Sequence, residues 1–524
     1  MEKVKSKNLI GYWGVIGLLV FLILWILPWR FEANDDVIMM WLVSGAYTGT
    51  PEPYAVFIHP LLSWSLSKLY TFMPFIQWYA FVWFLVLYAS FMGIVISVLD
   101  SCLSIRWKNL LLFSFLVLYI HFSLILQFTI VAGVAGFSGF LLANTSFGNS
   151  SKLGRCAVLF LLIISILIRW ESFALAALGY AFYQFIAVDR ISGASKFRTK
   201  TFLIIGLVFI LLQFFDFLYL KNSGYAEFKH YTKARANVFD HPVFYTLEKD
   251  HRLDQTSEWY FFSLFMMDGN QIDVEKLSEL KHELDKKLYS FDQIGKSLVR
   301  LREVMGFQNF KLAFSLLILC LCLWSCWKWP KYMLFLCTWL IFMLVFNHFF
   351  IVKARVYILF FLPLLYFING KTLISEVDTG IFLIFYLIVG GILIVHLVGF
   401  FEGAKRRESI AHDMKVLTDG QLNYNQLIIY EGYQQNFLPT QYNMINPVPF
   451  VSMGWISKSP FQAKALDRFG IKKISDASEF YLMGIYDDQD FKFPSYMEFL
   501  GYHYDLEDSW TGSYLSIFRY SSQK

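Results

Sequence analysis

Long apolar runs recur along this chain from residue 9 to residue 401, with short polar loops between most of them, and two long hydrophilic stretches stand apart from this pattern. A helix needs about 20 predominantly apolar residues to cross the hydrocarbon core of a bilayer. Eleven runs approach that length, at residues 9–29, 77–99, 109–127, 129–143, 155–169, 171–188, 201–220, 309–327, 332–351, 355–369 and 380–401. The pattern therefore predicts an α-helical polytopic membrane protein with about eleven transmembrane helices.

The composition supports the same class of protein. The 524 residues are 57% hydrophobic and only 16% charged, and the mean hydropathy is +0.49. These values lie outside the range of soluble domains. The net charge of +5 comes mainly from Lys and Arg in the short loops, so it indicates membrane topology, and no nucleic-acid partner is expected.

The positive charges also predict an orientation. Lys and Arg concentrate in alternate short loops, for example at Arg106, Lys152 and Arg155. Because such loops stay on the cytoplasmic side, the N-terminus is expected to be cytoplasmic, and the C-terminus and both long hydrophilic stretches extracytoplasmic. None of the six cysteines falls in either stretch, so no disulfides are expected there. Together with the short cytoplasmic loops, this favours a bacterial plasma (inner) membrane.

The two hydrophilic stretches differ in periodicity. Residues 271–305 place apolar side chains at helical spacing between charges, which predicts amphipathic helices lying on the membrane domain. Residues 421–524 alternate short runs rich in β-branched and aromatic residues with helix-like stretches, which predicts a small α/β domain. The expected organisation is an N-terminal transmembrane module, 1–220, with an acidic first outer loop, 30–76; a helical cap, 221–308; C-terminal transmembrane helices, 309–401; and an extracytoplasmic α/β domain, 402–524.

The first outer loop opens on an acidic cluster, Asn34, Asp35 and Asp36, directly after the first apolar run. One interpretation is helix capping, in which Asn34 or Asp35 accepts backbone N–H bonds at the start of an interfacial helix. A cap needs only one such side chain. A second acid beside a bilayer adds desolvation and like-charge repulsion, unless a cation or a substrate proton offsets them. The pair is therefore a candidate for an acidic centre.

The order of one span, a long first outer loop that opens on "NDD", many further spans and a soluble C-terminal domain resembles the GT-C superfamily of integral-membrane glycosyltransferases. The resemblance implies a GT-C-like fold and a catalytic Asp near the start of that loop, which Asp35 and Asp36 match in position. It also implies a polyprenyl-phosphate-linked sugar as donor. The acceptor would be a lipid-linked glycan, a cell-envelope polymer or a protein on the outer face of the membrane.

Such chemistry needs a carboxylate that accepts the acceptor's proton, and a cation or metal that neutralises the departing lipid phosphate. Asp35 or Asp36 fits the first role, and a divalent ion, Mg or Mn, could be shared by Asp35 and Glu171. Six basic residues at the ends of spans or near the start of the cap are candidates for phosphate binding: Arg169, Lys233, Arg235, His348, Lys353 and Arg355. The alternatives are snorkelling of the boundary residues to lipid headgroups and simple solvation of the cap residues.

Three other functions stay open. They are a lipid-linked-sugar flippase or exporter, an O-antigen-type polymerase that uses the same class of donor, and a non-catalytic envelope protein. Coupled transporters carry ionisable residues or broken helices near the bilayer midplane. Here the centres of the spans are nearly free of charge, and the polar groups gather at the outer boundary. This distribution favours outward-facing chemistry on a lipid-anchored substrate.

Overall fold

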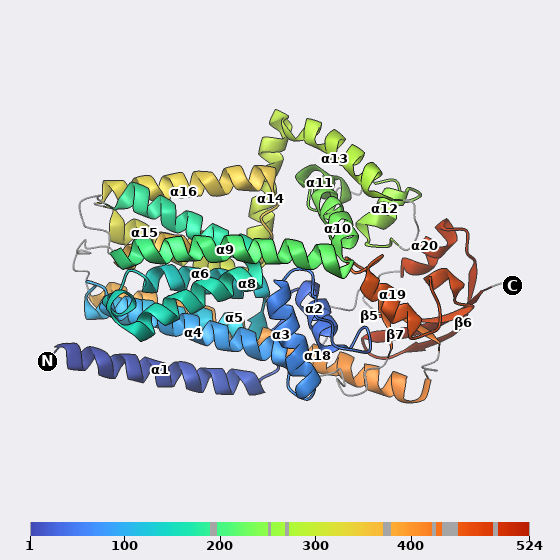
Figure 1. Cartoon of the computed structure of the whole chain (residues 1–524), viewed down its shortest axis with the longest axis horizontal. Helices are drawn as coiled ribbons and strands as arrows, with labels where there is room; N and C mark the ends of the chain where they lie inside the picture. Colours follow the sequence, from blue (N-terminus) through green and yellow to red (C-terminus); the bar gives the residue numbers. More distant parts are fainter. Residues whose placement is uncertain are drawn as a thin grey trace.

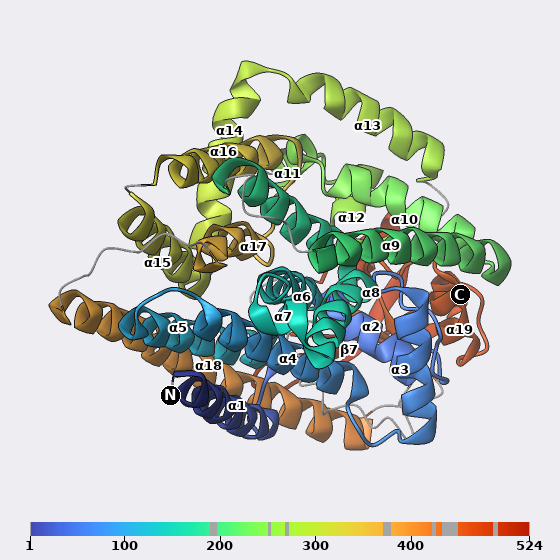
Figure 2. The ribbon, with the colours of Figure 1, turned by 60° about the vertical axis from the view of Figure 1, so that its left-hand side comes forward.

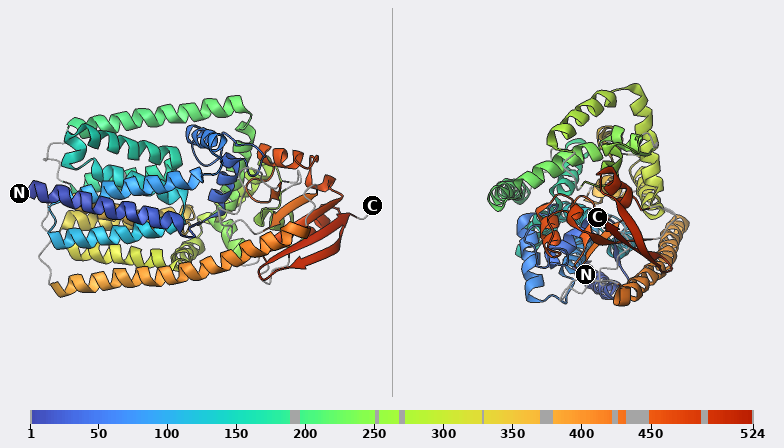
Figure 3. Two further views of the ribbon diagram at one scale, coloured as in Figure 1. Left: turned by 90° about the horizontal axis from the view of Figure 1, so that it is seen from below. Right: turned by 90° about the vertical axis from the view of Figure 1, so that its right-hand side faces the viewer.

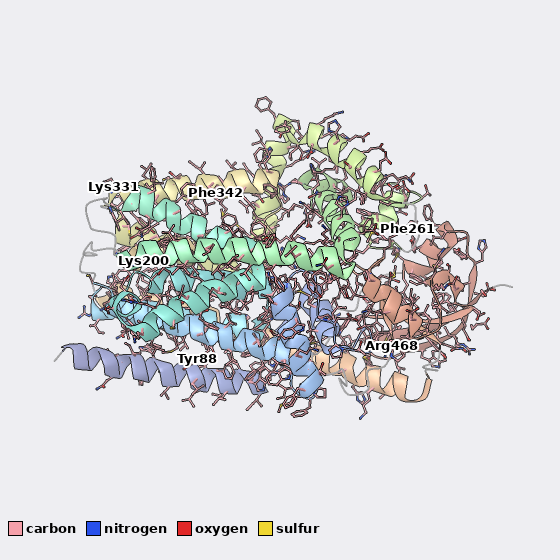
Figure 4. All side chains as sticks on the ribbon, viewed as in Figure 1. Tyr88, Lys200, Phe261, Lys331, Phe342 and Arg468 are labelled. Atoms are coloured by element: carbon pink, nitrogen blue, oxygen red, sulfur yellow. The ribbon has the colours of Figure 1, made fainter. Side chains whose placement is uncertain are left out.

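The structure is a computed structural model that describes residues 2–188, 196–249, 253–267, 272–327, 329–369, 379–421, 426–431, 449–485 and 491–522. The chain is mostly helical, and its two termini lie at opposite ends of an elongated molecule (Figure 1). Lys200 and Lys331 lie at the same end as the N-terminus (Figure 4). The small sheet of the C-terminal region lies at the other end, which we term the α/β end of the helix bundle.

Seven helices of the described residues are long and apolar enough to cross a membrane, and a bent pair of helices is an eighth candidate. The prediction of a helical bundle with several membrane spans is thus confirmed, whereas the structure gives seven or eight candidates and not eleven. The seven are α1 (Glu2–Ile26), α4 (Trp78–Asp100), α5 (Ile105–Leu124), α8 (Lys152–Phe182) with its continuation η1 (Tyr183–Ala187), α9 (Lys196–Ser223), α16 (Pro330–Phe349) and α18 (Thr379–Gln421).

Two of the predicted spans are short interior helices. Every residue of α6 (Phe128–Leu142) is buried, as is every residue of α17 (Tyr357–Phe361), which continues into η2 (Leu362–Asn369). A Cβ added to Gly133 of α6 would lie 2.6 Å from a methyl group of Leu359, so glycine is what allows this approach. A helix that is apolar all round is typical of a buried core as well as of a membrane span, and both helices are shorter than the seven candidate spans.

The helix α8 reverses its direction at Arg169, where the backbone is extended, with φ −159° and ψ 104°. A Cβ added to Gly136 of α6 would lie 3.0 Å from Ser165 Oγ and 3.3 Å from Ala176 Cβ. Residues on both sides of the break therefore pack against the same position of α6. The two predicted runs in this region, 155–169 and 171–188, are the two arms of one helical hairpin, and Arg169 is its tip.

The first outer loop contains two short helices, α2 (Asn34–Ser44) and α3 (Pro60–Phe72). Just before α2, the short strand β1 (Arg30–Phe31) pairs in parallel with β2 (Ile125–Leu126), with Arg30 opposite Ile125. Since α6 begins two residues after β2, this pair fixes the start of the first outer loop next to the N-terminus of the buried helix.

The helical cap lies at the α/β end of the bundle (Figure 1 and Figure 2). The amphipathic helices predicted in 271–305 are present as α13 and α14, and α14 bends by 107° into the apolar helix that follows. The helices of this region are α10 (Ala226–Phe239), α11 (Pro242–Lys249), α12 (Glu258–Ser263), α13 (Val274–Leu288), α14 (Phe291–Gly306) and then α15 (Asn309–Cys326).

The predicted small α/β domain is also present. The long helix α18 leaves the bundle and runs on to it (Figure 3). A five-stranded sheet has the order β4-β3-β5-β7-β6, in which β3 is parallel to β4 and β5, and β7 is antiparallel to β5 and β6. Its elements are β3 (Leu427–Glu431), β4 (Val451–Ser452), α19 (Pro460–Asp467), η4 (Ile474–Asp476), β5 (Glu479–Ile485), α20 (Phe493–Phe499), β6 (Tyr504–Thr511) and β7 (Leu515–Ser522).

The α/β domain packs directly on the first outer loop. Lys464 Nζ lies 2.7 Å and 2.9 Å from the two carboxylate oxygens of the buried Glu52. Arg468, labelled in Figure 4 near the junction of the domain and the bundle, donates to the backbone oxygen of Tyr47 at 3.0 Å. The ring of Phe450 packs edge-on against Trp41 of α2, with 4.8 Å between centroids. The domain therefore packs on the C-terminal part of α2 and on the loop that follows it.

Candidate active site

The helix α2 carries Asp35 and Asp36 in its first turn, and every residue from Asp35 to Ser44 is buried. The position before the helix is occupied by Ala33, and no side chain caps the helix. The predicted cap on α2 by Asn34 or Asp35 is therefore wrong. Both carboxylates instead bind groups from other parts of the chain. Helix capping therefore does not explain why two acids are adjacent here.

Asp36 is fully buried and holds the N-terminus of α6. Tyr79 Oη of α4 donates to Asp36 Oδ1 at 3.0 Å, and the backbone N–H of Phe128 donates to the same oxygen at 3.1 Å. Burial raises the pKa of Asp36 well above its usual range. The two hydrogen bonds oppose this rise, and the charge of Asp35 adds to it. Asp36 is thus a contact between α2, α4 and α6.

Asp35 is the more accessible of the two acids. Its Oδ2 lies 2.7 Å from Nη1 of Arg355, and 13% of the Asp35 side chain and 20% of the Arg355 side chain are exposed. Burial lowers the pKa of Arg355, but the negative charges of Asp35 and Asp36 outweigh it, so the net shift is upward. The result is a partly exposed carboxylate with a permanently charged guanidinium beside it.

A second, more deeply buried ion pair lies next to this site. Lys311 of α15 places Nζ 2.6 Å from Glu32 Oε1, and the exposed fractions of the two side chains are 1% and 6%. Gln308 also donates to Glu32 Oε1 at 2.6 Å, and Lys311 reaches the backbone oxygen of Ala354 at 3.5 Å. Because Ala354 directly precedes Arg355, the two ion pairs are linked through this short segment.

Arg169 approaches the site from the tip of the α8 hairpin. Its guanidinium lies over the ring of Phe128, 5.0 Å from the centroid, and forms an ion pair with Glu171 at 3.5 Å. Phe128 is the residue whose N–H binds Asp36. The ring of Phe57 stacks near Phe128, at 6.4 Å, and packs edge-on against Trp455 of the α/β domain at 4.7 Å.

Two residues with positive φ mark the loops that meet here. Val56, just before Phe57, has φ 66°, and Lys458, which follows Trp455 in the loop after β4, has φ 61°. A β-branched residue in this region of φ/ψ space is a genuine outlier. Backbone strain of this kind is retained only where the surrounding structure over-determines it, and it clusters at functional sites. The strain therefore supports this junction as the functional region.

The remaining predicted residues lie around the site but not in it. Lys353 pairs with Asp240 at 2.6 Å, and the buried Arg235 donates to the backbone oxygen of Trp455 at 2.7 Å. Lys233 is exposed on α10, and His348 packs against the ring of Phe349. The structure thus brings Arg355 to Asp35 and places Arg169 next to the helix start that Asp36 binds. Arg235 helps to hold the α/β domain.

Four residues of the site were not predicted from the sequence: Glu32, Tyr79, Gln308 and Lys311. Glu32 lies three residues before Asp35, and Lys311 lies at the beginning of an apolar run. The sequence does indicate that Lys311 has a partner, because a charged side chain just inside a membrane span is costly without one. The sequence does not name that partner, since Glu32 and Lys311 are far apart along the chain.

The two residues predicted to share a divalent ion, Asp35 and Glu171, have other partners in this structure. Asp35 and Glu171 each form an ion pair with an arginine. Across the described ranges, no three His, Cys, Asp or Glu side chains come together in a way that could hold a metal ion. The involvement of Mg or Mn stays an expectation.

Comparison of the chain with protein-family models, with curated proteins and with solved structures finds no match. The function is therefore inferred from the geometry of the acidic site and the membrane setting of the bundle.

Proposed function

We propose that this protein is a membrane glycosyltransferase of the GT-C type, in which Asp35 is the general base and Arg355 is its charged partner. The donor is a sugar linked to polyprenyl phosphate, and the acceptor is a hydroxyl of a lipid-linked glycan, an envelope polymer or a protein. The proposal includes the finer topology predicted from the sequence, with about eleven membrane passes, a cytoplasmic N-terminus and the α/β domain outside the plasma membrane.

The observation that carries the proposal is the difference between the surroundings of Asp35 and those of Asp36. Asp36 is fully buried and bound by Tyr79 and Phe128, whereas Asp35 keeps 13% of its side chain exposed and pairs, among the described residues, with Arg355. A structural role alone needs one acid at this turn. The second acid, held 2.7 Å from a guanidinium beside a membrane, has the placement of a general base that can accept a proton from a bound hydroxyl.

The transfer step can be written with these residues. The acceptor oxygen attacks the anomeric carbon of the donor, and the bond from that carbon to the phosphate oxygen breaks. The acceptor proton passes to Asp35, and the lipid phosphate leaves with the electron pair of the broken bond. Arg355 keeps Asp35 oriented before attack and balances charge as the phosphate departs, since a guanidinium can hold phosphate oxygens as well as a carboxylate.

The test is sugar transfer by the purified protein in lipid, with a panel of polyprenyl-phosphate-linked sugars as donors. Wild type is expected to transfer one donor class, and Asp35→Asn is expected to reduce the rate by a factor of about 10² to 10⁴, the usual contribution of a general base. A parallel assay with EDTA tests whether sugar transfer requires a divalent metal ion. If Asp35→Asn transfers sugar as fast as wild type, the assignment of the base is wrong; if no donor in the panel is used by wild type, transferase activity itself loses its support.

A further inference from the structure

A large cavity lies beside the acidic site, between α5, α15 and α18, and none of the residues proposed to bind the sugar donor lines it. Its volume is about 670 Å³. Figure 2 shows α18 at the edge of the bundle, alongside α5. Four of the side chains that line the cavity are basic, and they come from β1, α5 and α18: Arg30, His121, His396 and Arg407.

Neither arginine of this cavity forms an ion pair within the described residues, although Glu32 attracts Arg30 and Glu408 attracts Arg407 electrostatically. Arg407 is 6% exposed, its Nη2 reaches only the backbone oxygen of Pro28 at 3.5 Å, and its Nε is buried without a hydrogen-bond partner. Arg30 donates from Nη1 to the backbone oxygen of Phe31 at 3.1 Å. In the part of the chain that the structure describes, neither guanidinium is in an ion pair. A guanidinium that is shielded from water and has no carboxylate in direct contact is costly, so the cavity favours an anion.

The histidines add a further donor. His121 Nδ1 lies 3.0 Å from His396 Nε2, and the His121 ring stacks on Phe310 with 3.9 Å between centroids. His121 is 4% exposed, and its Nε2 is buried without a partner. When Nδ1 accepts the hydrogen bond from His396, Nε2 carries the proton. That N–H and the two guanidiniums can then bind several oxygens of one anion.

Apart from Gln308 and Asn309, the rest of the lining is apolar or glycine, and it reaches the outer surface of the bundle. A Cβ added to Gly391 or Gly399 of α18 would meet nothing within 4 Å, so this glycine face of α18 is open. Two apolar residues of the lining are largely exposed, Val395 by 74% and Phe307 by 81%. Apolar lining residues contribute nothing to the binding of a small aqueous anion. They do suit a hydrocarbon chain, whose contacts with apolar side chains replace its contacts with the bilayer.

We infer that this cavity binds the headgroup of a phosphate-bearing membrane lipid, with the phosphate between Arg30 and Arg407 and the hydrocarbon chain along the glycine face of α18. The inference does not depend on sugar transfer at Asp35. It does connect to that site, because Gln308 lines the cavity and donates to Glu32, whose ion pair with Lys311 lies next to Arg355.

The experiment measures lipid binding to the purified full chain by native mass spectrometry and by displacement of a labelled lipid. The probes are a polyprenyl phosphate, phosphatidylglycerol, the uncharged polyprenol and inorganic phosphate. Arg407→Gln and Arg30→Gln are expected to weaken binding of the phosphate-bearing lipid about tenfold or more, the effect of removing a charge-assisted hydrogen bond. Lys405→Gln is the matched control, since Lys405 is an exposed cation on the same turn of α18, and it should bind as wild type does.

A second variant addresses the hydrocarbon chain without changing any charge. Gly399→Leu fills open space along α18. It is expected to weaken the binding of polyprenyl phosphate and of phosphatidylglycerol, while the protein stays folded. Tighter binding of either lipid than of inorganic phosphate supports the inference, and the preferred lipid identifies its source. Equal binding of polyprenol and polyprenyl phosphate, or full binding by Arg407→Gln, would overturn it. Because binding is the readout, these results stand apart from any failure to detect sugar transfer.

Discussion

Asp36 of α2 accepts a hydrogen bond from the backbone N–H of Phe128, the first residue of the buried helix α6, at 3.1 Å. The contact joins the first outer loop to the innermost helix of the bundle. It also fixes the turn that carries Asp35. The role of Asp36 is therefore to position its neighbour, and this relationship leads to separate expectations for the two acids.

Asp36→Asn is expected to fold, because the amide oxygen can accept both hydrogen bonds that now reach Oδ1. Asp36→Ala leaves Tyr79 Oη and the Phe128 N–H buried without an acceptor, which costs about 1–3 kcal/mol for each lost partner. Thermal unfolding in detergent should show a clear loss for alanine and a much smaller one for asparagine. Equal losses for the two variants would contradict the proposed contact.

The raised pKa of Asp36 predicts a dependence of stability on pH. A carboxyl group whose pKa is higher in the folded state binds its proton more strongly there. Its contribution to the free energy of unfolding is therefore largest at pH values below about 3.9, the usual pKa of Asp, and it declines as the pH rises through the folded-state pKa. Asp36→Asn removes this decline.

The measurement is chemical unfolding of wild type and Asp36→Asn over the pH range from the usual Asp pKa upward. Lowering the pH should increase the stability of wild type relative to the variant. If the two curves stay parallel, the proton affinity of Asp36 does not change on folding and the burial argument fails.

The buried pair of Glu32 and Lys311 should be sensitive to the loss of either partner. Lys311→Met leaves the Glu32 carboxylate buried without its cation, and such losses cost about 3–5 kcal/mol. Replacing both residues, by Glu32→Gln with Lys311→Met, should cost less than the sum of the single changes. A double-mutant cycle measures this coupling.

The matched control for that cycle is the exposed pair of Asp292 and Lys296, one turn apart on α14. Its loss is expected to cost only about 0–1 kcal/mol, because water screens the charges. Similar costs for the buried and the exposed pair would contradict the burial of Glu32 and Lys311.

The contact between Glu52 and Lys464 predicts how the α/β domain is held. Glu52 is 2% exposed and also lies within 3.4 Å of Tyr225 Oη. Glu52→Ala should therefore loosen the domain from the first outer loop, which amide hydrogen exchange detects as faster exchange in α19 and β4. Glu498→Ala, an exposed change on α20, should leave exchange there unchanged, and protection retained in Glu52→Ala would contradict the docking role.

Much of the bundle could be predicted from the sequence, because apolar runs of about 20 residues are long enough to cross a bilayer and rarely occur in soluble domains. The same signal does not separate α6 and α17 from core helices, since an apolar run of their length is compatible both with a short buried helix and with a membrane span. The hairpin at Arg169 was correctly placed as a break between two apolar runs.

The site was predictable in part. Two adjacent acids after the first span marked the location, and Arg355 was among the candidate cations. The pairing of Asp35 with Arg355, the separate role of Asp36 and the pair of Glu32 with Lys311 all join residues far apart along the chain. Local periodicity and residue type carry no information on such partners, so these relationships required the structure.

Whether Asp35 is the general base is tested most sharply by comparing the rates of sugar transfer by Asp35→Asn and Asp36→Asn at saturating donor and acceptor. Both changes remove one carboxylate from the same turn, so each controls for the other. We expect a loss of about 10² to 10⁴ for Asp35→Asn and a rate for Asp36→Asn that stays close to that of wild type. The reverse order, or equal rates for the two variants, would contradict the assignment of Asp35 as the base.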